Sequence, residues 1–343
     1  MKTYYLSNLY EKDKAANDLI SFLENQFKEI EGCIYYAFPI IKDMYMPEVY
    51  PNVFFVSNEY GIYAFVCDEI TEDRDNGIKR IADKCATLDS QIYSKLIKNK
   101  KLCKTPRNLK LNFEVKMYLP NFNDYTTNEE NVFTSKKEIE KYIEENKNES
   151  NDEDLVFEVM STLEATDAII KPKAREINIE NKNSKSYVLS KLEADIARFD
   201  DMQRVAALSM LDGPQRIRGL AGTGKTIILC MKAAMLHYRY PDKQILYTFY
   251  TKSLYDYIQQ LITRFFIKIS DGRIPDFENH ILIKHAWGGQ NLKGVYYDTC
   301  ISNNIKPLVL GDVREKENPF DYICNDLIVK SEAKLNKDYD VKY

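Results

Sequence analysis

A phosphate-binding motif stands at residues 219–226, where the sequence reads Gly-Leu-Ala-Gly-Thr-Gly-Lys-Thr. A triphosphate carries dense negative charge on oxygens that need many hydrogen-bond donors at once. Gly222 and Gly224 leave room for backbone N–H groups to approach those oxygens. Lys225 can reach the β- and γ-phosphates, and the Thr226 hydroxyl can ligate Mg²⁺. The residues expected to touch the nucleotide or its Mg²⁺ are Gly219, Ala221, Gly222, Thr223, Gly224, Lys225 and Thr226.

The segments around the motif have the pattern of a strand, a loop and a helix. Residues 215–220 read as a short strand. Residues 227–236 read as a mostly buried helix, which Pro241 ends. A glycine-rich loop between a strand and a helix is the arrangement in which such a motif binds phosphate, so an α/β fold is expected here.

Composition limits the class of protein. The 343 residues suffice for two domains with separate cores. The net charge of −4 excludes a surface that is basic throughout, so contact with nucleic acid must be confined to a local groove. The seven cysteines form no C-x-x-C pair and there are only three histidines, which argues against disulfides and zinc. No signal peptide and no run of ~20 apolar residues is found, so a cytoplasmic protein without membrane contact is expected.

Two polar stretches suggest the domain boundaries. Residues 144–154 are charged and lack aromatic side chains, which is typical of a solvated loop. Residues 180–186 are also polar and precede a helix predicted at 187–198. We therefore predict a smaller domain at 1–145, a connecting region at 146–190 and a nucleotide-binding domain at 191–343.

Periodicity predicts the elements of the first domain. Leu19, Leu23 and Phe27 recur every four residues and predict a helix over 17–29. Residues 53–56 and 62–66 predict a strand hairpin with a turn between them. A helix over 77–99 and a strand over 109–119, which Pro120 stops, complete an α/β or α+β core.

Residues 196–343 resemble the first half of the first RecA-like domain of UvrD/Rep-type superfamily 1 DNA helicases. Besides the phosphate-binding loop, Gln203 lies 22 residues before Lys225, where this family has an adenine-reading glutamine. Its carboxamide can pair with the adenine edge as donor and acceptor. The resemblance thus implies a partial RecA-like domain that binds ATP and Mg²⁺.

Two further segments resemble parts of the family that contact single-stranded DNA. The first is residues 245–253, a buried strand and a turn, where Thr248, Phe249, Tyr250 and Lys252 would hold phosphates or stack a base. The second is residues 281–287, with His285 and Trp287, although Ile283 and Lys284 replace the family's Thr and Phe. In the first segment the alternative is that the aromatic side chains are core residues and that Lys252 is a solvated lysine. Trp287 suits a packing anchor as well as a stacking platform.

No apolar strand ending in Asp-Glu, the family's motif II, follows the phosphate-binding loop, and the last residues resemble only the lead-in to it. The resemblance therefore implies the first part of an ATP-dependent DNA helicase, or one member of a split system whose remaining motifs come from a separate polypeptide. Its partner would be single-stranded or partly duplex DNA. Because phosphoryl transfer depends on such positioned groups, poor ATP hydrolysis is expected. The alternative is a regulatory ATP- or DNA-binding module without motor activity.

The hairpin at residues 51–68 resembles the core of nuclease-related (NERD-like) domains, which carry a metal site of the form Asp…Glu-x-Lys. Aligned on the turn, these residues become Asn52, Val66 and Asp68, so the resemblance implies a degenerate site without nuclease activity. Glu114-Val115-Lys116 spells Glu-x-Lys outside the hairpin, and we expect its charges on a solvent-facing strand surface. An active nuclease remains a third interpretation.

Overall fold

The computed structural model describes residues 1–42, 47–69, 74–122, 131–147, 155–168, 200–211 and 213–331. The chain divides into two compact units, Met1–Asp212 and Gly213–Tyr343. Both combine helices with strands, and most strand pairs outside the central hairpin are parallel. The mixed α/β class expected from the sequence is therefore confirmed.

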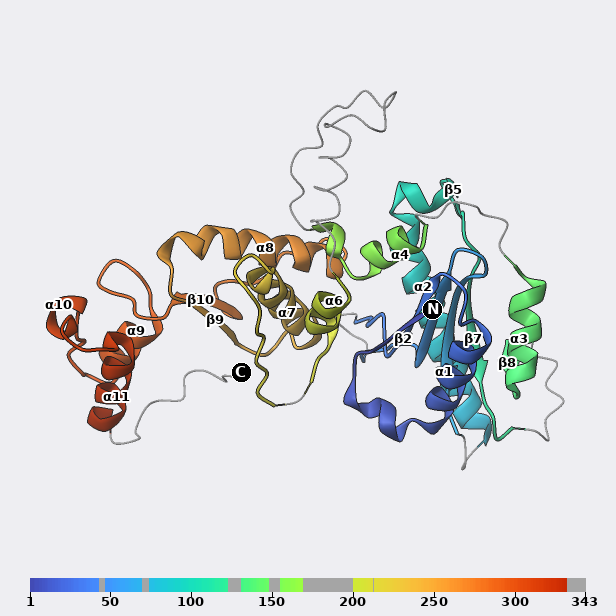
Figure 1. Cartoon of the computed structure of the whole chain (residues 1–343), viewed down its shortest axis with the longest axis horizontal. Coiled ribbons are helices and arrows are strands. Elements are labelled where there is room, and N and C mark those ends of the chain that lie inside the picture. Colours follow the sequence, from blue (N-terminus) through green and yellow to red (C-terminus); the bar gives the residue numbers. More distant parts are fainter. Residues whose placement is uncertain are drawn as a thin grey trace, which may run out of the picture. The chain divides into compact units, whose positions relative to one another are not determined.

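A six-stranded sheet forms the centre of the first unit, with the strand order β1-β2-β3-β4-β7-β8 (Figure 1). The strands are β1 (Lys2–Tyr5), β2 (Gly32–Tyr36), β3 (Val53–Ser57), β4 (Gly61–Cys67), β7 (Phe113–Tyr118) and β8 (Val132–Phe133). The pairs β2/β3 and β3/β4 are antiparallel, whereas β1/β2, β4/β7 and β7/β8 are parallel. A two-stranded ribbon of β5 (Cys103–Thr105) and β6 (Asn108–Leu109) lies apart from this sheet.

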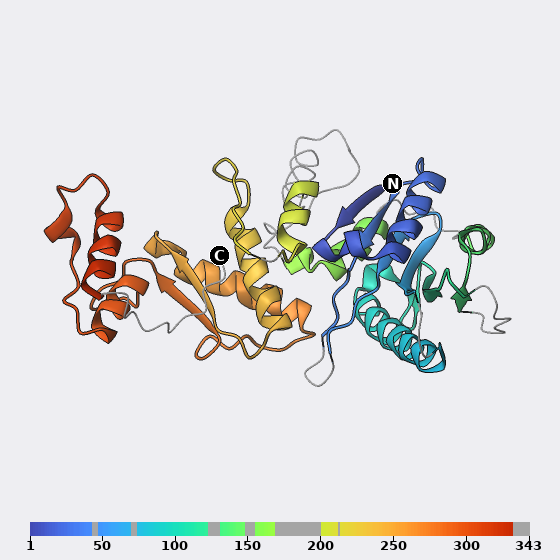
Figure 2. The same cartoon turned by 90° about the horizontal axis from the view of Figure 1, so that it is seen from below.

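Helices cover both faces of this sheet. One face packs against α1 (Lys14–Gln26) and α3 (Lys136–Glu145), whose buried side chains share a core with alternate residues of β3 and β4. The long helix α2 (Arg74–Ile97) packs on the opposite face, as Figure 2 shows. Because both faces are covered, every residue of β3 and β4 is buried.

The predicted elements of the first domain are confirmed, with ends that shift by a few residues. Helix α1 corresponds to the predicted helix at 17–29, and α2 to that at 77–99. The hairpin β3–β4 pairs Val53 with Phe65 and Ser57 with Gly61. The predicted strand at 109–119 is shorter, as β7. The solvated loop predicted at 144–154 starts later, because α3 continues to Glu145, and residues 148–154 lie outside the described residues.

The first unit extends beyond residue 145. Helix α4 (Leu155–Leu163), the short helix η3 (Thr166–Ala168) and helix α6 (Asp201–Leu208) all belong to it. Part of the predicted connecting region therefore packs on the first unit, with Leu155, Val159 and Leu163 buried. The predicted helix at 187–198 and the boundary at 190 lie outside the described residues. The short helices η1 (Asn8–Lys12) and η2 (Lys100–Leu102) complete this unit's described elements.

In the second unit, a parallel pair of strands packs with two helices. Strands β9 (Ile245–Phe249) and β10 (Ile281–His285) pair in register, and α7 (Lys225–Arg239) and α8 (Tyr255–Ile269) pack on each other and on the strands. The helix and strands predicted here are confirmed as elements, but β9 is half-buried to exposed instead of buried as expected. The strand predicted at 215–220 is wrong: this segment is exposed and without regular structure, because no described strand pairs with it.

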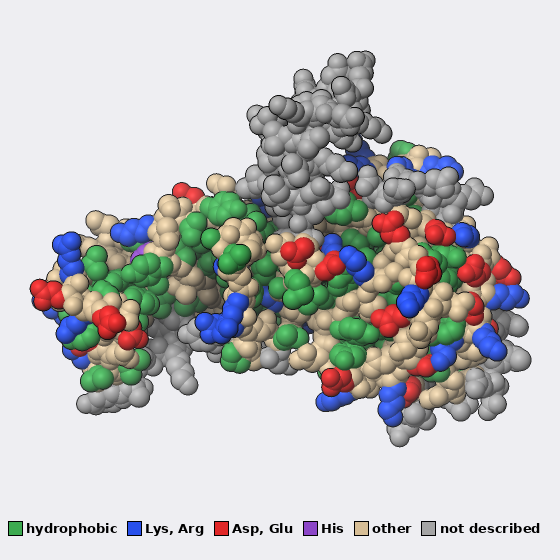
Figure 3. Space-filling model, in the orientation of Figure 1, with side chains coloured by type: hydrophobic (Ala, Val, Ile, Leu, Met, Phe, Trp, Pro, Cys, Tyr) green, Lys and Arg blue, Asp and Glu red, His purple; other side chains and the backbone are tan. Residues whose placement is uncertain are grey.

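A small helical cluster follows β10. Helices α9 (Val295–Ser302), α10 (Leu310–Val313) and α11 (Pro319–Ser331) enclose a separate core around Trp287 and Tyr296. Apolar side chains also reach the surface of the second unit, as Figure 3 shows; the exposed ones in these helices include Ile301, Leu310, Tyr322, Ile328 and Val329. Within the described residues, no helix has the length and apolar character needed to cross a membrane.

Candidate nucleotide and nucleic-acid sites

The phosphate-binding loop has the backbone that its glycines allow. Gly222 and Gly224 adopt positive φ values of 83° and 72°, in the left-handed region that other residues avoid. Gly224 precedes α7, so the first N–H groups of this helix receive no side-chain cap from it. A Cβ atom at Gly219 would lie 2.6 Å from Thr223 Oγ1, whereas one at Gly222 would meet open space. The loop thus presents backbone donors and a helix N-terminus to solvent.

Lys225 lies folded over this loop. Its Nζ donates to the carbonyl oxygens of Gly219, at 2.9 Å, and Leu220, at 2.6 Å. The Thr223 hydroxyl donates to the same Leu220 oxygen at 2.9 Å. Thr226 follows on the first turn of α7 and is half-buried. The loop residues named from the sequence are therefore brought together, and a phosphate would compete with these carbonyls for the ammonium group.

Gln203 lies in the first unit, on α6, whereas the loop lies in the second. It forms a capping box with Asp200: its backbone N–H donates to Asp200 Oδ1 at 2.7 Å, and its Oε1 accepts from Asp200 N at 3.0 Å. The carboxamide therefore already has a structural role at the start of α6. The adenine-reading role stays a prediction.

The residues predicted to bind nucleic acid gather at the carboxyl ends of β9 and β10. Parallel pairing sets Thr248 opposite Lys284 and Phe249 opposite His285. Thr248, Tyr250 and Lys252 are exposed, and Lys252 opens the short helix η4 (Lys252–Leu254). Phe249 is half-buried, its ring 5.9 Å from that of His285. The two segments quoted from the sequence thus form one edge of the sheet.

His285 and Trp287 turn inward at this edge. His285 Nδ1 accepts from the backbone N–H groups of Trp287 and Gly288, both at 3.0 Å, and its Nε2 lies 2.7 Å from Tyr250 O. Trp287 is 9% exposed, and its Nε1 donates to Leu308 O at 3.2 Å. Of the two alternatives for Trp287, the structure therefore shows the packing anchor. Lys284 pairs with Asp298 at 2.9 Å.

In the first unit, Asn52 stands at the position of the metal-site aspartate and is occupied by hydrogen bonds within the protein. Asn52 Nδ2 donates to Asp13 Oδ2 at 2.7 Å, and Asn52 Oδ1 accepts from Cys67 N at 3.1 Å. The Tyr36 hydroxyl donates to the same Asp13 oxygen at 3.1 Å. Val66 is buried and Asp68 pairs with Arg80. Within the described residues, no group of three or more His, Cys, Asp or Glu side chains is placed to hold a metal ion.

The Glu-x-Lys sequence on β7 was expected to face solvent, but the structure shows that it does not. Lys116 is 5% exposed and contacts Glu114 Oε2 at 2.7 Å. The hydroxyl of Tyr142, on α3, donates to the same oxygen at 2.7 Å, and the Lys116 ammonium lies 4.4 Å from the centre of its ring. Burial lowers the pKa of Lys116, but hydrogen bonds to Glu114 and Tyr142 outweigh it and leave the pKa raised. The expectation failed because α3 covers this end of β7.

A buried ionic network, not anticipated from the sequence, holds α6 on the first unit. Arg204 Nε lies 2.6 Å from Glu164 Oε1, and Tyr35 OH donates to that oxygen at 2.8 Å. Asp201 accepts from Tyr4 OH at 2.6 Å and pairs with Lys2 at 2.8 Å. Burial raises the pKa of Glu164 despite the opposing effect of Arg204. Arg204 follows Glu164 by 40 residues (204 − 164), so no local pattern marks the pair.

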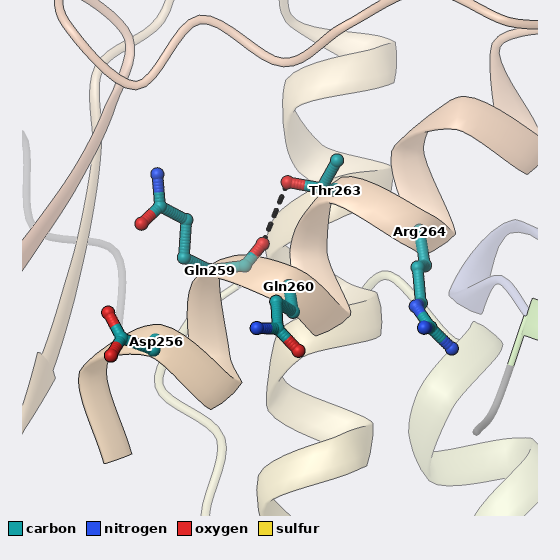
Figure 4. A pocket seen from close by; sticks show the side chains of 5 residues that line it. All are labelled: Asp256, Gln259, Gln260, Thr263 and Arg264. Carbon is teal, nitrogen blue, oxygen red and sulfur yellow. Dashed lines mark hydrogen bonds between the residues drawn. The ribbon is translucent and has the colours of Figure 1, made fainter. Parts of the chain in front are cut away.

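A shallow polar pocket lies along α8. Its lining comes from one face of this helix, with Asp256, Gln259, Gln260, Thr263 and Arg264 (Figure 4). The Thr263 hydroxyl donates to the backbone oxygen of Gln259 at 2.8 Å, an ordinary contact within a helix. None of the residues singled out from the sequence lines this pocket.

No protein-family model, no curated protein and no solved structure matches this chain significantly. The function is therefore inferred from the residues of the chain alone.

Proposed function

We propose that this chain binds ATP with Mg²⁺ at the loop before α7 and single-stranded nucleic acid at the carboxyl ends of β9 and β10, as the first part of a superfamily 1-type helicase. The observation that carries the proposal is the loop geometry, in which Gly222 and Gly224 are left-handed and Lys225 follows at the start of α7. Donors of this kind suit a polyphosphate. ATP hydrolysis coupled to movement on DNA is the activity that the sequence resemblance adds.

The nucleic-acid part of the proposal rests on the strand ends. Thr248 and Lys252 are exposed donors beside the exposed ring of Tyr250, at an edge where parallel sheets bind ligands. Hydroxyls and an ammonium group suit phosphates, while an aromatic ring suits a base. Such a local site agrees with the negative net charge of the chain, which disfavours nucleic-acid binding over its whole surface.

Substitution of Lys225 tests the nucleotide site. Lys225→Ala removes the ammonium expected on the β- and γ-phosphates, and a lost charged hydrogen bond costs about 1.5–3 kcal/mol. Calorimetry with Mg·ATP should therefore show binding weakened about 10- to 150-fold. The matched control is Lys306→Ala, which removes an exposed lysine of the same unit and should leave the affinity unchanged. Equal affinities of wild type and Lys225→Ala would refute the site.

A further inference from the structure

His285, at the end of β10, has a hydrogen-bond partner at both ring nitrogens. Nδ1 accepts from two backbone N–H groups, those of Trp287 and Gly288. An imidazole nitrogen that accepts carries no proton, so the proton is on Nε2. Nε2 therefore donates to Tyr250 O, at 2.7 Å. His285 is also 6% exposed, so neither nitrogen is left to contact a ligand.

His285 holds Tyr250, which is more exposed than the neighbouring Tyr255 at the start of α8, whose exposed fraction is 39%. Tyr250 is 59% exposed. Its ring centre lies 5.8 Å from that of His285, with 31° between the planes, and 5.7 Å from that of Phe320, which meets it edge to face. One hydrogen bond to its backbone and two ring contacts thus fix the tyrosine while more than half of its surface stays open.

The other aromatics at the edge are less suited to stacking. Trp287 is buried against Tyr296 and Phe320. Phe249 is half-buried and lies between the rings of Tyr255 and His285. Stacking of a base needs an exposed ring that is already held in place, because ordering it on binding costs free energy.

The geometry points to Tyr250 as the residue on which a base of single-stranded nucleic acid stacks, and to His285 as the positioning residue that holds it. This inference rests on the proposed nucleic-acid site and assigns roles within it. Exposed Lys252 would contact phosphate beside the stacked base. The helical cluster contributes Phe320, so α11 helps to build the platform.

Binding of a short single-stranded DNA that contains 2-aminopurine tests the stacking role in the full chain. The base's fluorescence should be quenched on wild type. Tyr250→Ala should abolish the quenching and weaken binding about 5- to 150-fold, the range for one lost base–aromatic stack. Tyr250→Phe should bind as wild type. The control Tyr240→Ala removes another exposed tyrosine, after α7, and should change nothing.

Two substitutions of His285 separate positioning from support of the turn. His285→Asn keeps an acceptor for the turn's N–H groups but is too short to donate to Tyr250 O. His285→Gln can donate to Tyr250 O but loses the acceptor for the turn. We expect His285→Asn to lose most of the quenching with an unchanged melting temperature, and His285→Gln to retain the quenching with a lower one. Full quenching in His285→Asn would overturn the positioning role.

The salt dependence of binding distinguishes this inference from the proposed function. Tyr250→Ala should leave the slope of log K against log salt unchanged, whereas Lys252→Ala should make it shallower by about 0.7. If wild type binds the DNA and Tyr250→Ala binds and quenches equally, the stacking role is wrong but the nucleic-acid site stands. If wild type binds no DNA, the proposed function itself fails.

Discussion

Gln203 has an observed role in the cap of α6 and a predicted role in reading adenine, and a substitution can separate the two roles. The capping box needs only the Oε1 acceptor, which the structure shows bonded to Asp200 N. Recognition of adenine needs an N–H donor as well. The amide hydrogens of Gln203 are therefore the atoms on which base selectivity would depend.

Gln203→Glu should keep the helix cap and remove the donor, because glutamate serves equally well in a capping box. We expect this variant to melt like wild type but to lose the preference for ATP over GTP, measured by calorimetry. Gln203→Ala should lose that preference and also some stability, about 0.5–1.5 kcal/mol for the lost hydrogen bond to Asp200 N. Wild-type selectivity in Gln203→Glu would mean that the adenine is read elsewhere.

Among the elements, α6 depends on a buried ion pair for its place on the first unit. The Glu164 side chain is fully buried, and that of Arg204 is 12% exposed. Removing one partner of such a pair leaves the other charge buried without compensation.

Arg204→Met should therefore destabilise the chain by about 3–5 kcal/mol in urea unfolding. Combining it with Glu164→Gln should recover much of the loss, because no unpaired charge then remains. The control is Lys2→Met, which breaks the exposed pair with Asp201 and should cost about 0–1 kcal/mol. If Arg204→Met costs no more than Lys2→Met, the network does not hold α6.

Helix α7 carries a buried histidine near its far end. His237 is 6% exposed, its Nε2 accepts from Asp276 N at 3.5 Å, and its Nδ1 has no hydrogen-bond partner among the described residues. Burial, with the charges of His280 and Arg273, lowers the pKa of His237 below its usual 6.5, against the opposing effect of Asp276.

Because the folded state holds His237 less protonated than the unfolded state does, its contribution to stability is complete above pH 6.5 and is lost as the pH falls through the lower folded-state pKa. His237→Gln should thus lose less stability than wild type between pH 7.5 and about 5, measured by urea unfolding at each pH. Because the charge of His280 also lowers the pKa of His237, His280→Gln should reduce the loss of stability at low pH as well. Parallel pH profiles of wild type and His237→Gln would contradict the assignment.

At the scale of the whole molecule, the hairpin β3–β4 of the first unit resembles nuclease-related domains in sequence only, and among the described residues its end carries no clustered carboxylates. Where a metal site needs clustered oxygens, the Asn52 amide donates to Asp13 and occupies its carboxylate. Lys116 and Glu114 neutralise each other under Tyr142.

The full chain should therefore leave supercoiled plasmid intact in Mg²⁺ or Mn²⁺, as followed on agarose gels. The physical reason is that neither cluster offers two free carboxylates to order a metal and activate water. Cleavage that disappears in Glu114→Ala would show that β7, rather than the hairpin, carries an active site.

The sequence by itself determined the features that depend on neighbouring residues. Local spacing and periodicity predicted the phosphate-binding loop with Lys225, the helix after it, the hairpin β3–β4 and the strands β9 and β10. These patterns reflect the geometry of the local backbone, so they can be recognised without the rest of the fold. Only the tertiary structure decided which of these side chains keep polar atoms available for a ligand. Trp287 is a core residue, His285 uses Nδ1 on the turn and Nε2 on Tyr250 O, and Lys116 is covered by α3. Glu164 and Arg204 met across 40 residues of chain. Residues 215–220 failed to form a strand for the same reason: pairing and burial depend on what lies opposite in space, which no local pattern encodes.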